Sequence, residues 1–189
     1  MEVIGITGSI ATGKSTVTNY LKEHGYLVVD SDKLAYDALT IDEACIKMTK
    51  ARFKLGPGPI DRKALGKIIF HDEKAKKDLE GIIHPYVIRK IKEMIAMNQD
   101  QKIIFLDIPL LFESNLEYLC DMIMVVYLNK NEEIKRLMKR DQISEDYATT
   151  IINNQMSIEE KKMRADIVID NNQGLDELYK QIEAMLKGR

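Results

Sequence analysis

The chain has 189 residues, of which 45% are hydrophobic and 31% are charged. These proportions are typical of folded globular proteins and exclude bulk disorder, and the length fits one domain with an inserted lobe. The 28 basic and 30 acidic residues leave a net charge of −2, which disfavours a protein that acts on nucleic acid. Two widely separated cysteines, Cys45 and Cys120, argue against a disulfide scaffold or a zinc site.

The longest apolar run, Met122–Leu128, is far shorter than the roughly 20 residues that a membrane-spanning helix needs. The first residues also lack the basic and long apolar regions of a signal peptide. We therefore expect a cytoplasmic protein without a membrane partner. We also expect it to act as a monomer.

The first thirty residues alternate between strand and helix patterns. Val3–Thr7 is a short apolar run that predicts a buried strand. Lys14–His24 has apolar residues at helical spacing, and Gly25 follows as a stop signal. Leu27–Val29 predicts a second strand, so this segment predicts a right-handed βαβ unit.

A helical stretch follows. Three segments have helical patterns: Lys33–Lys50, Arg62–Phe70 and Glu73–Met97. The first pattern is interrupted near Thr40, and Pro85 predicts a break or kink in the third. Residues 56–59 read Gly-Pro-Gly-Pro and predict a loop. Because residues 41–100 contain no strand candidate, we expect them to form an inserted helical lobe.

The last part of the chain returns to alternation. Strands are predicted at Ile103–Leu106, Met122–Leu128 and Ile167–Ile169. Helices are predicted at Glu132–Arg140, Ser144–Gln155 and Leu175–Leu186. Five short apolar strands separated by helices predict an α/β fold, with a five-stranded parallel sheet flanked by helices on both faces. Ligands bind such sheets at the carboxyl ends of the strands.

Residues Gly8–Ser15 read Gly-Ser-Ile-Ala-Thr-Gly-Lys-Ser and fit the phosphate-loop pattern Gly-x-x-x-x-Gly-Lys-Ser/Thr without a mismatch. They follow a predicted strand and open a predicted helix, where loop amides and the helix N-terminus can surround an anion. Lys14 is placed to reach the β- and γ-phosphates, and the Ser15 hydroxyl to hold Mg²⁺. The alternative is a tight corner with a solvated Lys14. The pattern and its context predict a nucleoside triphosphate site.

Three classes of phosphate-loop protein compete: small-molecule kinases, GTPase switches and ATPases that act on macromolecules. Residues 129–132 read Asn-Lys-Asn-Glu and resemble a guanine-reading motif, but that motif ends in Asp, so we interpret them as a helix start. Residues 78–81 have Asp-x-x-Gly spacing but lie in a charged helical stretch. An ATPase would usually show paired acids after a strand, whereas Ile103–Asp107 supplies one.

A kinase needs a base beside the acceptor hydroxyl, cations around the phosphoryl group and a lid that excludes water. Asp32, at the end of the second strand, is the candidate base. A helix N-cap explains one of the two acids Asp30 and Asp32 but not both. Arg136 and Arg140 lie four residues apart on one helix face and would clamp phosphate. A solvated charged face, with Glu133 or Asp141 as ion-pair partners, is the alternative.

Several longer runs match a known family. They are Ile6–Thr16, Asp30–Asp32, Ile60–Arg62, Leu79–Pro85, Asp107–Glu113, Arg136–Asp141, Gln155 and Ala165–Asn171. On these runs the chain resembles the dephospho-coenzyme A kinase family over its whole length. The resemblance implies a P-loop kinase-like core of residues 1–40, 101–129 and 160–189. It also implies a helical substrate lobe at 41–100 and a helical lid at 130–159.

The reaction that the resemblance implies is the last step of coenzyme A synthesis. ATP, with Mg²⁺, phosphorylates the ribose 3′-hydroxyl of dephospho-coenzyme A. Asp32, Lys14 and Arg140 are then the catalytic residues. The implied nucleotide site comprises Gly8, Ala11, Thr12, Gly13, Lys14, Ser15, Thr16, Arg136 and Arg140, with Ser15 on the metal. The implied acceptor site comprises Asp32, Arg62, His84, Pro85, Asp107, Pro109 and Leu110. Asp107 is also placed to reach the metal through water.

The chain departs from the family's usual residues at three positions. Ser9 and Ala11 stand where members commonly have Gly, and Ser31 stands where they have Ala. The loop must therefore adopt its backbone angles without those glycines. Two other functions stay open on the sequence: a nucleoside or nucleoside-monophosphate kinase, and a nucleotide-gated switch protein that is not an enzyme.

Overall fold

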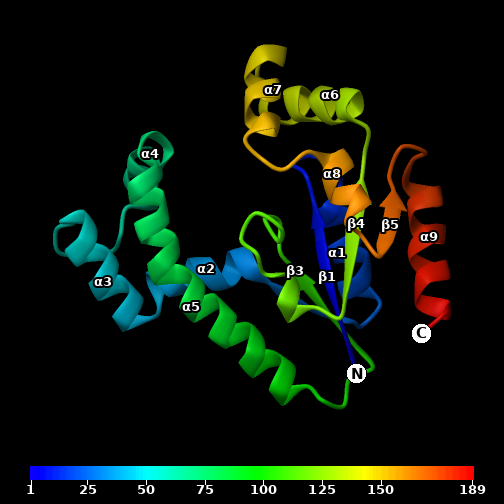
Figure 1. Cartoon of the computed structure of the whole chain (residues 1–189), viewed down its shortest axis with the longest axis horizontal. Helices are drawn as coiled ribbons and strands as arrows, with labels where there is room; N and C mark the ends of the chain where they lie inside the picture. Colours follow the sequence, from blue (N-terminus) through cyan, green and yellow to red (C-terminus); the bar gives the residue numbers. More distant parts are fainter. The chain divides into compact units, whose positions relative to one another are not determined.

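The computed structural model describes residues 1–189 and divides into two compact units. The first unit comprises residues 1–29 and 99–189, and it contains the sheet. The second unit comprises residues 30–98 and is helical. Figure 1 shows both units, coloured along the chain from blue to red, and labels most of their helices and strands. No helix is long and apolar enough to cross a membrane.

The sheet has five strands in the order β2-β3-β1-β4-β5, and the predicted number of strands is confirmed. The strands are β1 Glu2–Gly8, β2 Leu27–Asp30, β3 Ile103–Asp107, β4 Met122–Tyr127 and β5 Ile167–Asp170. Parallel pairing joins β1 to β3 and β4, and β4 to β5. The register sets Ile6 beside Asp107 and Gly8 beside Val126, so the ends of three central strands meet at one edge.

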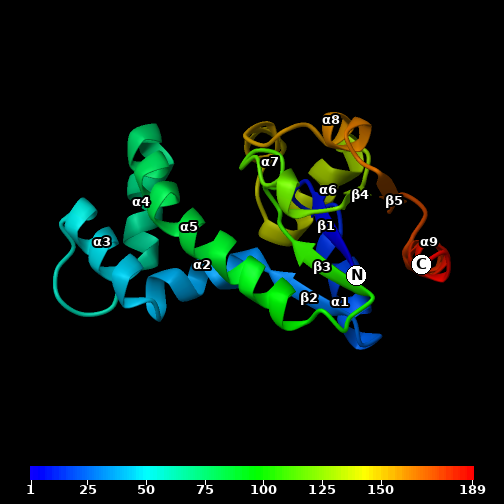
Figure 2. The same ribbon diagram turned by 60° about the horizontal axis from the view of Figure 1, so that its bottom comes forward.

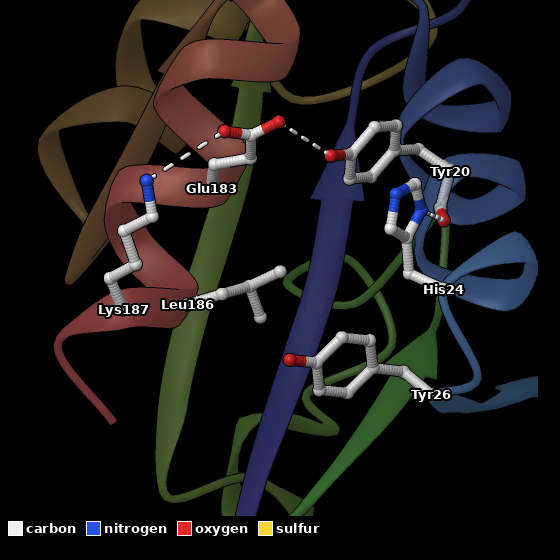
Figure 3. A pocket seen from close by; sticks show the side chains of 6 residues that line it. All are labelled: Tyr20, His24, Tyr26, Glu183, Leu186 and Lys187. Atoms are coloured by element: carbon white, nitrogen blue, oxygen red, sulfur yellow. Dashed lines mark hydrogen bonds and ion pairs between the residues drawn. The ribbon is translucent and has the colours of Figure 1, made fainter.

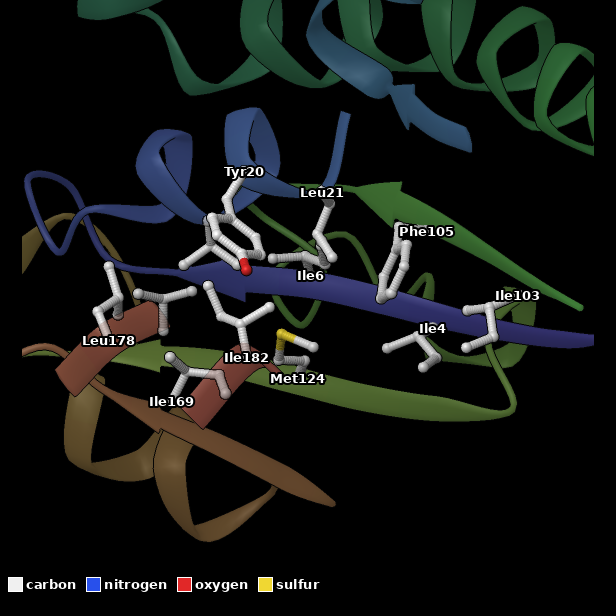
Figure 4. Close-up of a cluster of buried hydrophobic side chains, with 12 residues drawn as sticks. Ile4, Ile6, Tyr20, Leu21, Ile103, Phe105, Met124, Ile169, Leu178 and Ile182 are labelled. Atoms are coloured by element: carbon white, nitrogen blue, oxygen red, sulfur yellow. The ribbon is translucent and has the colours of Figure 1, made fainter. Parts of the chain in front are cut away.

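One face of the sheet is covered by α1 (Lys14–Glu23) and α9 (Leu175–Lys187), as Figure 4 shows. Alternate residues of the strands point into this layer because side chains alternate along a strand. The buried set is Ile4, Ile6, Val17, Tyr20, Leu21, Ile103, Phe105, Met124, Val126, Ile169, Leu178 and Ile182. Burying each large side chain stabilises the fold by about 1.5–3 kcal/mol, which fixes α1 and hence its N-terminus on the sheet.

The short helix α8 (Ile158–Met163) packs against β4, and the 3₁₀ turn η1 (Glu117–Leu119) packs against β1. The Tyr127 hydroxyl, on the face opposite Val126, donates to Glu159 at 2.6 Å. The sequence analysis missed both elements. Each is shorter than two helical turns, and four of the six residues of α8 are charged, so neither carries an apolar period.

Helices α6 (Lys130–Asp141) and α7 (Glu145–Asn153) form a second small core in the same unit. Leu137, Ala148 and Ile152 are buried in it. Ile10 and Ala11 of the phosphate loop pack against this cluster. The phosphate loop therefore lies under the two helices that the sequence assigns to the lid.

The second unit contains α2 (Ser31–Thr40), α3 (Glu43–Phe53), α4 (Arg62–His71) and α5 (Glu73–Met97), drawn from light blue to green in Figure 2. The predicted interruption near Thr40 is confirmed. Each helix starts after an aspartate whose side chain accepts first-turn amides: Asp30, Asp42, Asp61 and Asp72. Leu39, Leu65 and Leu79 form the centre of the small core of this unit.

Helix α5 continues through Pro85, so the predicted alternative of a break is wrong. A proline inside a helix removes one hydrogen bond and costs about 3 kcal/mol. Tyr86, Val87 and Ile91 are buried immediately after it, and their burial offsets that cost. Tertiary packing thus overrides the local preference.

Candidate active site

The phosphate loop runs from the end of β1 to the start of α1. Gly13 is the N-cap of α1 with φ 96°, and no side chain caps the helix, so its first amides are available to an anion. A Cβ on Gly13 would lie 2.2 Å from Asn171 Nδ2, and a Cβ on Gly8 would lie 2.9 Å from the Val126 carbonyl oxygen. Both glycines are therefore required by backbone shape and close packing.

The two departures from the family pattern have visible consequences in the loop. Ala11 adopts φ 63°, in the left-handed region that glycine occupies without strain. Ser9 is buried, and its hydroxyl contacts Glu133 and Gln155. Thr12 closes the loop, since its hydroxyl donates to the Ser9 carbonyl oxygen at 2.9 Å. Packing of Ile10 and Ala11 against α6 and α7 supports this turn.

Lys14 forms an ion pair with Asp107 at the end of β3. The adjacent parallel strands place this acid beside the loop, although the two residues lie 93 positions apart. Ser15 and Thr16 follow in the first turn of α1, where Ser15 is exposed. The structure thus brings the predicted loop residues and Asp107 together.

The two lid arginines occupy different surroundings. Arg136 donates to the Asn171 carbonyl oxygen at 3.1 Å, and Asn171 Nδ2 donates to the Thr12 carbonyl oxygen at 2.8 Å. Arg136 is therefore attached to the loop. Arg140 is exposed and forms two hydrogen bonds to its neighbour Asp141, the ion-pair partner that the sequence analysis considered. Asn171 was not singled out because an asparagine after a strand carries no periodic signal.

A buried lysine is the second residue that the sequence analysis missed. Lys161 of α8 is 0% exposed and forms an ion pair with Glu113 at 2.9 Å. Its ammonium group also donates to the carbonyl oxygens of Gly8 and Pro109. Burial lowers its pKa, although Glu113 opposes that effect. Lys161 therefore joins the start of the phosphate loop to the turn after β3.

Pro109 and Leu110 lie in that turn. The Thr7 hydroxyl donates to the Pro109 carbonyl oxygen at 2.9 Å, and Leu110 is exposed. Asp107, at the end of β3, also lies in the sheet unit, whereas the other predicted acceptor residues belong to the helical unit. Asp32 is exposed in the first turn of α2, and Arg62 stacks its guanidinium 4.6 Å from the Tyr36 ring centre.

His84 and Pro85 lie in the middle of α5, half-buried and exposed respectively. The cap of α2 is Asp30, whose side chain accepts the Lys33 amide at 3.1 Å. Capping therefore accounts for Asp30 and not for Asp32.

The two segments that resembled GTPase motifs have structural roles. Asn129 caps α6 by accepting the Glu132 amide at 3.0 Å, which confirms the predicted helix start. Asp78 lies within α5 and pairs with Arg52, which confirms the predicted helical face.

A pocket lies between α1 and α9, as Figure 3 shows, away from the phosphate loop. Its lining residues are Tyr20, His24, Tyr26, Glu183, Leu186 and Lys187. The Tyr20 hydroxyl donates to Glu183 at 3.1 Å, and His24 Nδ1 lies 2.8 Å from the Tyr20 carbonyl oxygen. These polar groups satisfy one another, and they lie toward the C-terminal ends of both helices.

The surroundings of both cysteines favour the neutral thiol. Burial raises the pKa of the Cys45 thiol to about 11 and that of Cys120 to about 12. Neither thiol lies in a cluster of metal-ligating side chains. Both therefore serve as small packing residues.

A parallel sheet of order 2-3-1-4-5 with a phosphate loop between its central strand and α1 defines a phosphate-loop nucleotide-binding protein of the kinase-like class. The sequence model of the dephospho-CoA kinase family matches residues 2–177. A dephospho-CoA kinase of Fusobacterium nucleatum is 42% identical over 184 residues, covering 96% of this chain and 95% of the relative. The chain belongs to the dephospho-CoA kinase family.

Solved structures agree. A protein from Thermus thermophilus superposes with a TM-score of 0.85 at 35% identity and covers 99% of this chain and 97% of its own. Dephospho-CoA kinase from Campylobacter jejuni superposes with a TM-score of 0.72 at 32% identity, covering 98% and 95%. The predicted family and fold class are confirmed.

Proposed function

We propose that this chain transfers the γ-phosphoryl group of ATP to the ribose 3′-hydroxyl of dephospho-coenzyme A, giving coenzyme A and ADP. The observation that carries the proposal is membership of the dephospho-CoA kinase family over residues 2–177, with an intact phosphate loop inside the match. The product would complete coenzyme A synthesis. The enzyme is accordingly a transferase that phosphorylates a hydroxyl group.

A magnesium ion fits the groups beside the loop. Mg²⁺ prefers oxygen ligands and is usually held by one or two protein groups together with substrate phosphates. The Ser15 hydroxyl and the Asp107 carboxylate are oxygen donors of this kind, and no larger acidic or histidine cluster exists to hold a metal alone. When bound, the ion would neutralise charge on the β- and γ-phosphates.

The proposed nucleotide contacts follow from the loop. The amides at the uncapped start of α1, from Gly13 to Ser15, surround the phosphates, and Lys14 places its ammonium group on the transferring phosphoryl group. Asp107 orients Lys14 through their ion pair. Arg136 is held beside the loop by Asn171. Arg140 must exchange Asp141 for phosphate as the lid closes.

Asp32 is proposed to orient and deprotonate the 3′-hydroxyl, because it is an exposed carboxylate and the cap of its helix is a different residue, Asp30. Arg62, His84, Pro85, Pro109 and Leu110 are proposed to line the acceptor site, as the family resemblance implies. The division into a core (1–40, 101–129 and 160–189), a substrate lobe (41–100) and a lid (130–159) belongs to the same proposal. So do the monomeric state and the cytoplasmic location.

Mass spectrometry of dephospho-coenzyme A after incubation with the protein, ATP and Mg²⁺ tests the proposal directly. We expect the substrate to gain one phosphoryl group, and we expect the Lys14→Ala variant to give none. If ATP binds but the acceptor stays unchanged, the proposal is wrong. Phosphorylation of a nucleoside or a nucleoside monophosphate instead would assign the chain to the alternative kinase class.

A further inference from the structure

The Ser9 hydroxyl lies between two acceptor oxygens. Its Oγ forms a short contact with Glu133 Oε1 of α6 and lies 3.3 Å from Gln155 Oε1. The Ile10 amide donates to the same Gln155 oxygen at 3.1 Å. That amide fixes the orientation of the Gln155 side chain, since the reverse orientation would set an N–H group against an N–H group.

Counting protons decides how these groups are bonded. A serine hydroxyl has one proton to donate, and an ionised carboxylate has none. With Glu133 ionised, Ser9 donates to Glu133, and the contact between Ser9 and Gln155 has no proton. With Glu133 protonated, its O–H donates to Ser9 Oγ, and the Ser9 O–H donates to Gln155 Oε1. Only the protonated state gives every contact a hydrogen.

We propose that Glu133 is a protonated carboxyl and a positioning residue of the phosphate loop. Its proton completes a hydrogen-bond chain from α6 through Ser9 to Gln155, which also receives the Ile10 amide. The chain thereby attaches two consecutive loop residues, Ser9 to α6 and Ile10 to the turn after α7. The proposal rests on the proposed function only in taking ATP as the ligand of the loop.

The surroundings of Glu133 support the neutral state. The side chain is 0% exposed, and its Oε2 atom has no hydrogen-bond partner. An ionised carboxylate without partners in the interior is costly, whereas a protonated one needs fewer donors. Burial raises the pKa of Glu133 and outweighs the hydrogen bond from Ser9 and the charges of Lys130 and Lys161, which lower it.

The nearby cations do not form an ion pair with Glu133. Lys161 directs its ammonium group at Glu113 and at the carbonyl oxygens of Gly8 and Pro109, which uses all three of its protons. Lys130 donates to Asn153 at 3.0 Å. Lys14 pairs with Asp107. These three lysines therefore form their hydrogen bonds and ion pairs with groups other than Glu133.

Loss of this proton would affect the nucleotide. As the pH rises through the raised pKa of Glu133, the hydrogen-bond chain breaks at Ser9, and a negative charge forms beneath the loop that receives the phosphates. We expect ATP affinity to fall by about tenfold, the coupling equivalent to one pKa unit. Affinity is full below the pKa and is about tenfold weaker above it.

Isothermal titration calorimetry with ATP from about pH 5 to about pH 9, a range in which buried carboxyls titrate, measures this effect. ATP itself titrates in this range, so a baseline for its own pH dependence is needed. The Glu133→Gln variant supplies this baseline, because its amide N–H donates to Ser9 at every pH. We expect this variant to retain its affinity where the natural chain loses it. The matched control is Glu132→Gln, which removes a charge from the adjacent surface residue that pairs with Lys135. This control should follow the natural chain.

A second measurement reports the proton itself. Carbon-13 NMR of side-chain carboxyls, with the Glu133 signal assigned by its absence in Glu133→Gln, gives the pKa directly. We expect a pKa above the ordinary glutamate value and equal to the midpoint of the affinity change. A Glu133 that titrates at or below the ordinary value overturns the proposal, as does a Glu133→Gln variant with the natural pH dependence. Neither experiment uses the acceptor, so failure of the proposed kinase reaction would be seen separately.

Discussion

The helical unit and the phosphate-loop site are held together in different ways. In the unit of residues 30–98, each helix starts with an aspartate that accepts amides two or three positions further along the chain. At the phosphate loop, the side-chain contacts span 93 residues from Lys14 to Asp107, 124 from Ser9 to Glu133 and 159 from Thr12 to Asn171.

The difference follows from what each region has to do. A cap satisfies amides that any helix leaves unpaired, so local residues suffice. An anion site needs fixed donors and cations converging on one point, and in a parallel sheet that point collects residues from several strand ends. The phosphate loop therefore depends on long-range contacts, and the starts of the helices in the helical unit depend on short ones.

The strongest loss of activity should come from the centre of the long-range site. Lys14→Ala should lower kcat by about 10³-fold or more, because it removes the cation on the transferring phosphoryl group and leaves Asp107 without its partner. Steady-state kinetics with dephospho-coenzyme A measures it. The control is Lys22→Ala, an exposed lysine on the same helix, which should change little. Equal activity of both variants would remove Lys14 from the mechanism.

The Asp32→Asn variant tests whether the helical unit contributes a catalytic residue to phosphoryl transfer. We expect kcat to fall by about 10²- to 10³-fold, the usual contribution of a general base. Asp30→Asn is the control, since asparagine caps a helix as well as aspartate does. Unchanged activity in both variants would exclude Asp32 as the base and would limit the unit to a structural role.

Arg140 is an exception within the sheet unit, because this predicted site residue forms an ion pair with its sequence neighbour Asp141. Arg140→Ala should lower kcat by at least about tenfold, because the arginine binds phosphate when the lid closes. The pair with Asp141 is exposed to solvent and adds little stability, so unfolding does not explain such a loss. Lys139→Ala, beside it on α6, is the control. Unchanged kinetics in Arg140→Ala would favour a solvated surface pair.

The smallest expected effects come from removing one long-range contact of the loop and one local helix cap. Asn171→Ala should lower the free energy of unfolding by about 1–3 kcal/mol, because the buried Thr12 carbonyl oxygen loses its donor. Asp61→Ala should cost about 1 kcal/mol, since it removes the cap that accepts the Lys63 and Ala64 amides. Urea unfolding measures both, with Asp61→Asn as a control that keeps the cap. A larger loss for Asp61→Ala would reverse the comparison.

Much of the fold could be predicted because its signals are local. The strands are short apolar runs, the helices have apolar residues at helical spacing, and the gap between α2 and α3 follows a break in that spacing. The helix α8 and the continuation of α5 through Pro85 could not be predicted. The first depends on its contact with β4, and the second depends on buried neighbours that outweigh the local cost of proline.

The phosphate loop could be located without the structure, because eight consecutive residues carry its glycines, its lysine and its serine. The distant groups that support the loop can be identified only from the folded structure. Lys161 and Glu133 are fully buried, although their residue types usually predict exposure, and Asn171 holds Arg136 and Thr12 across the sheet edge. These groups meet because parallel strands bring their carboxyl ends to one edge, and spacing along the chain does not record which residues face each other there.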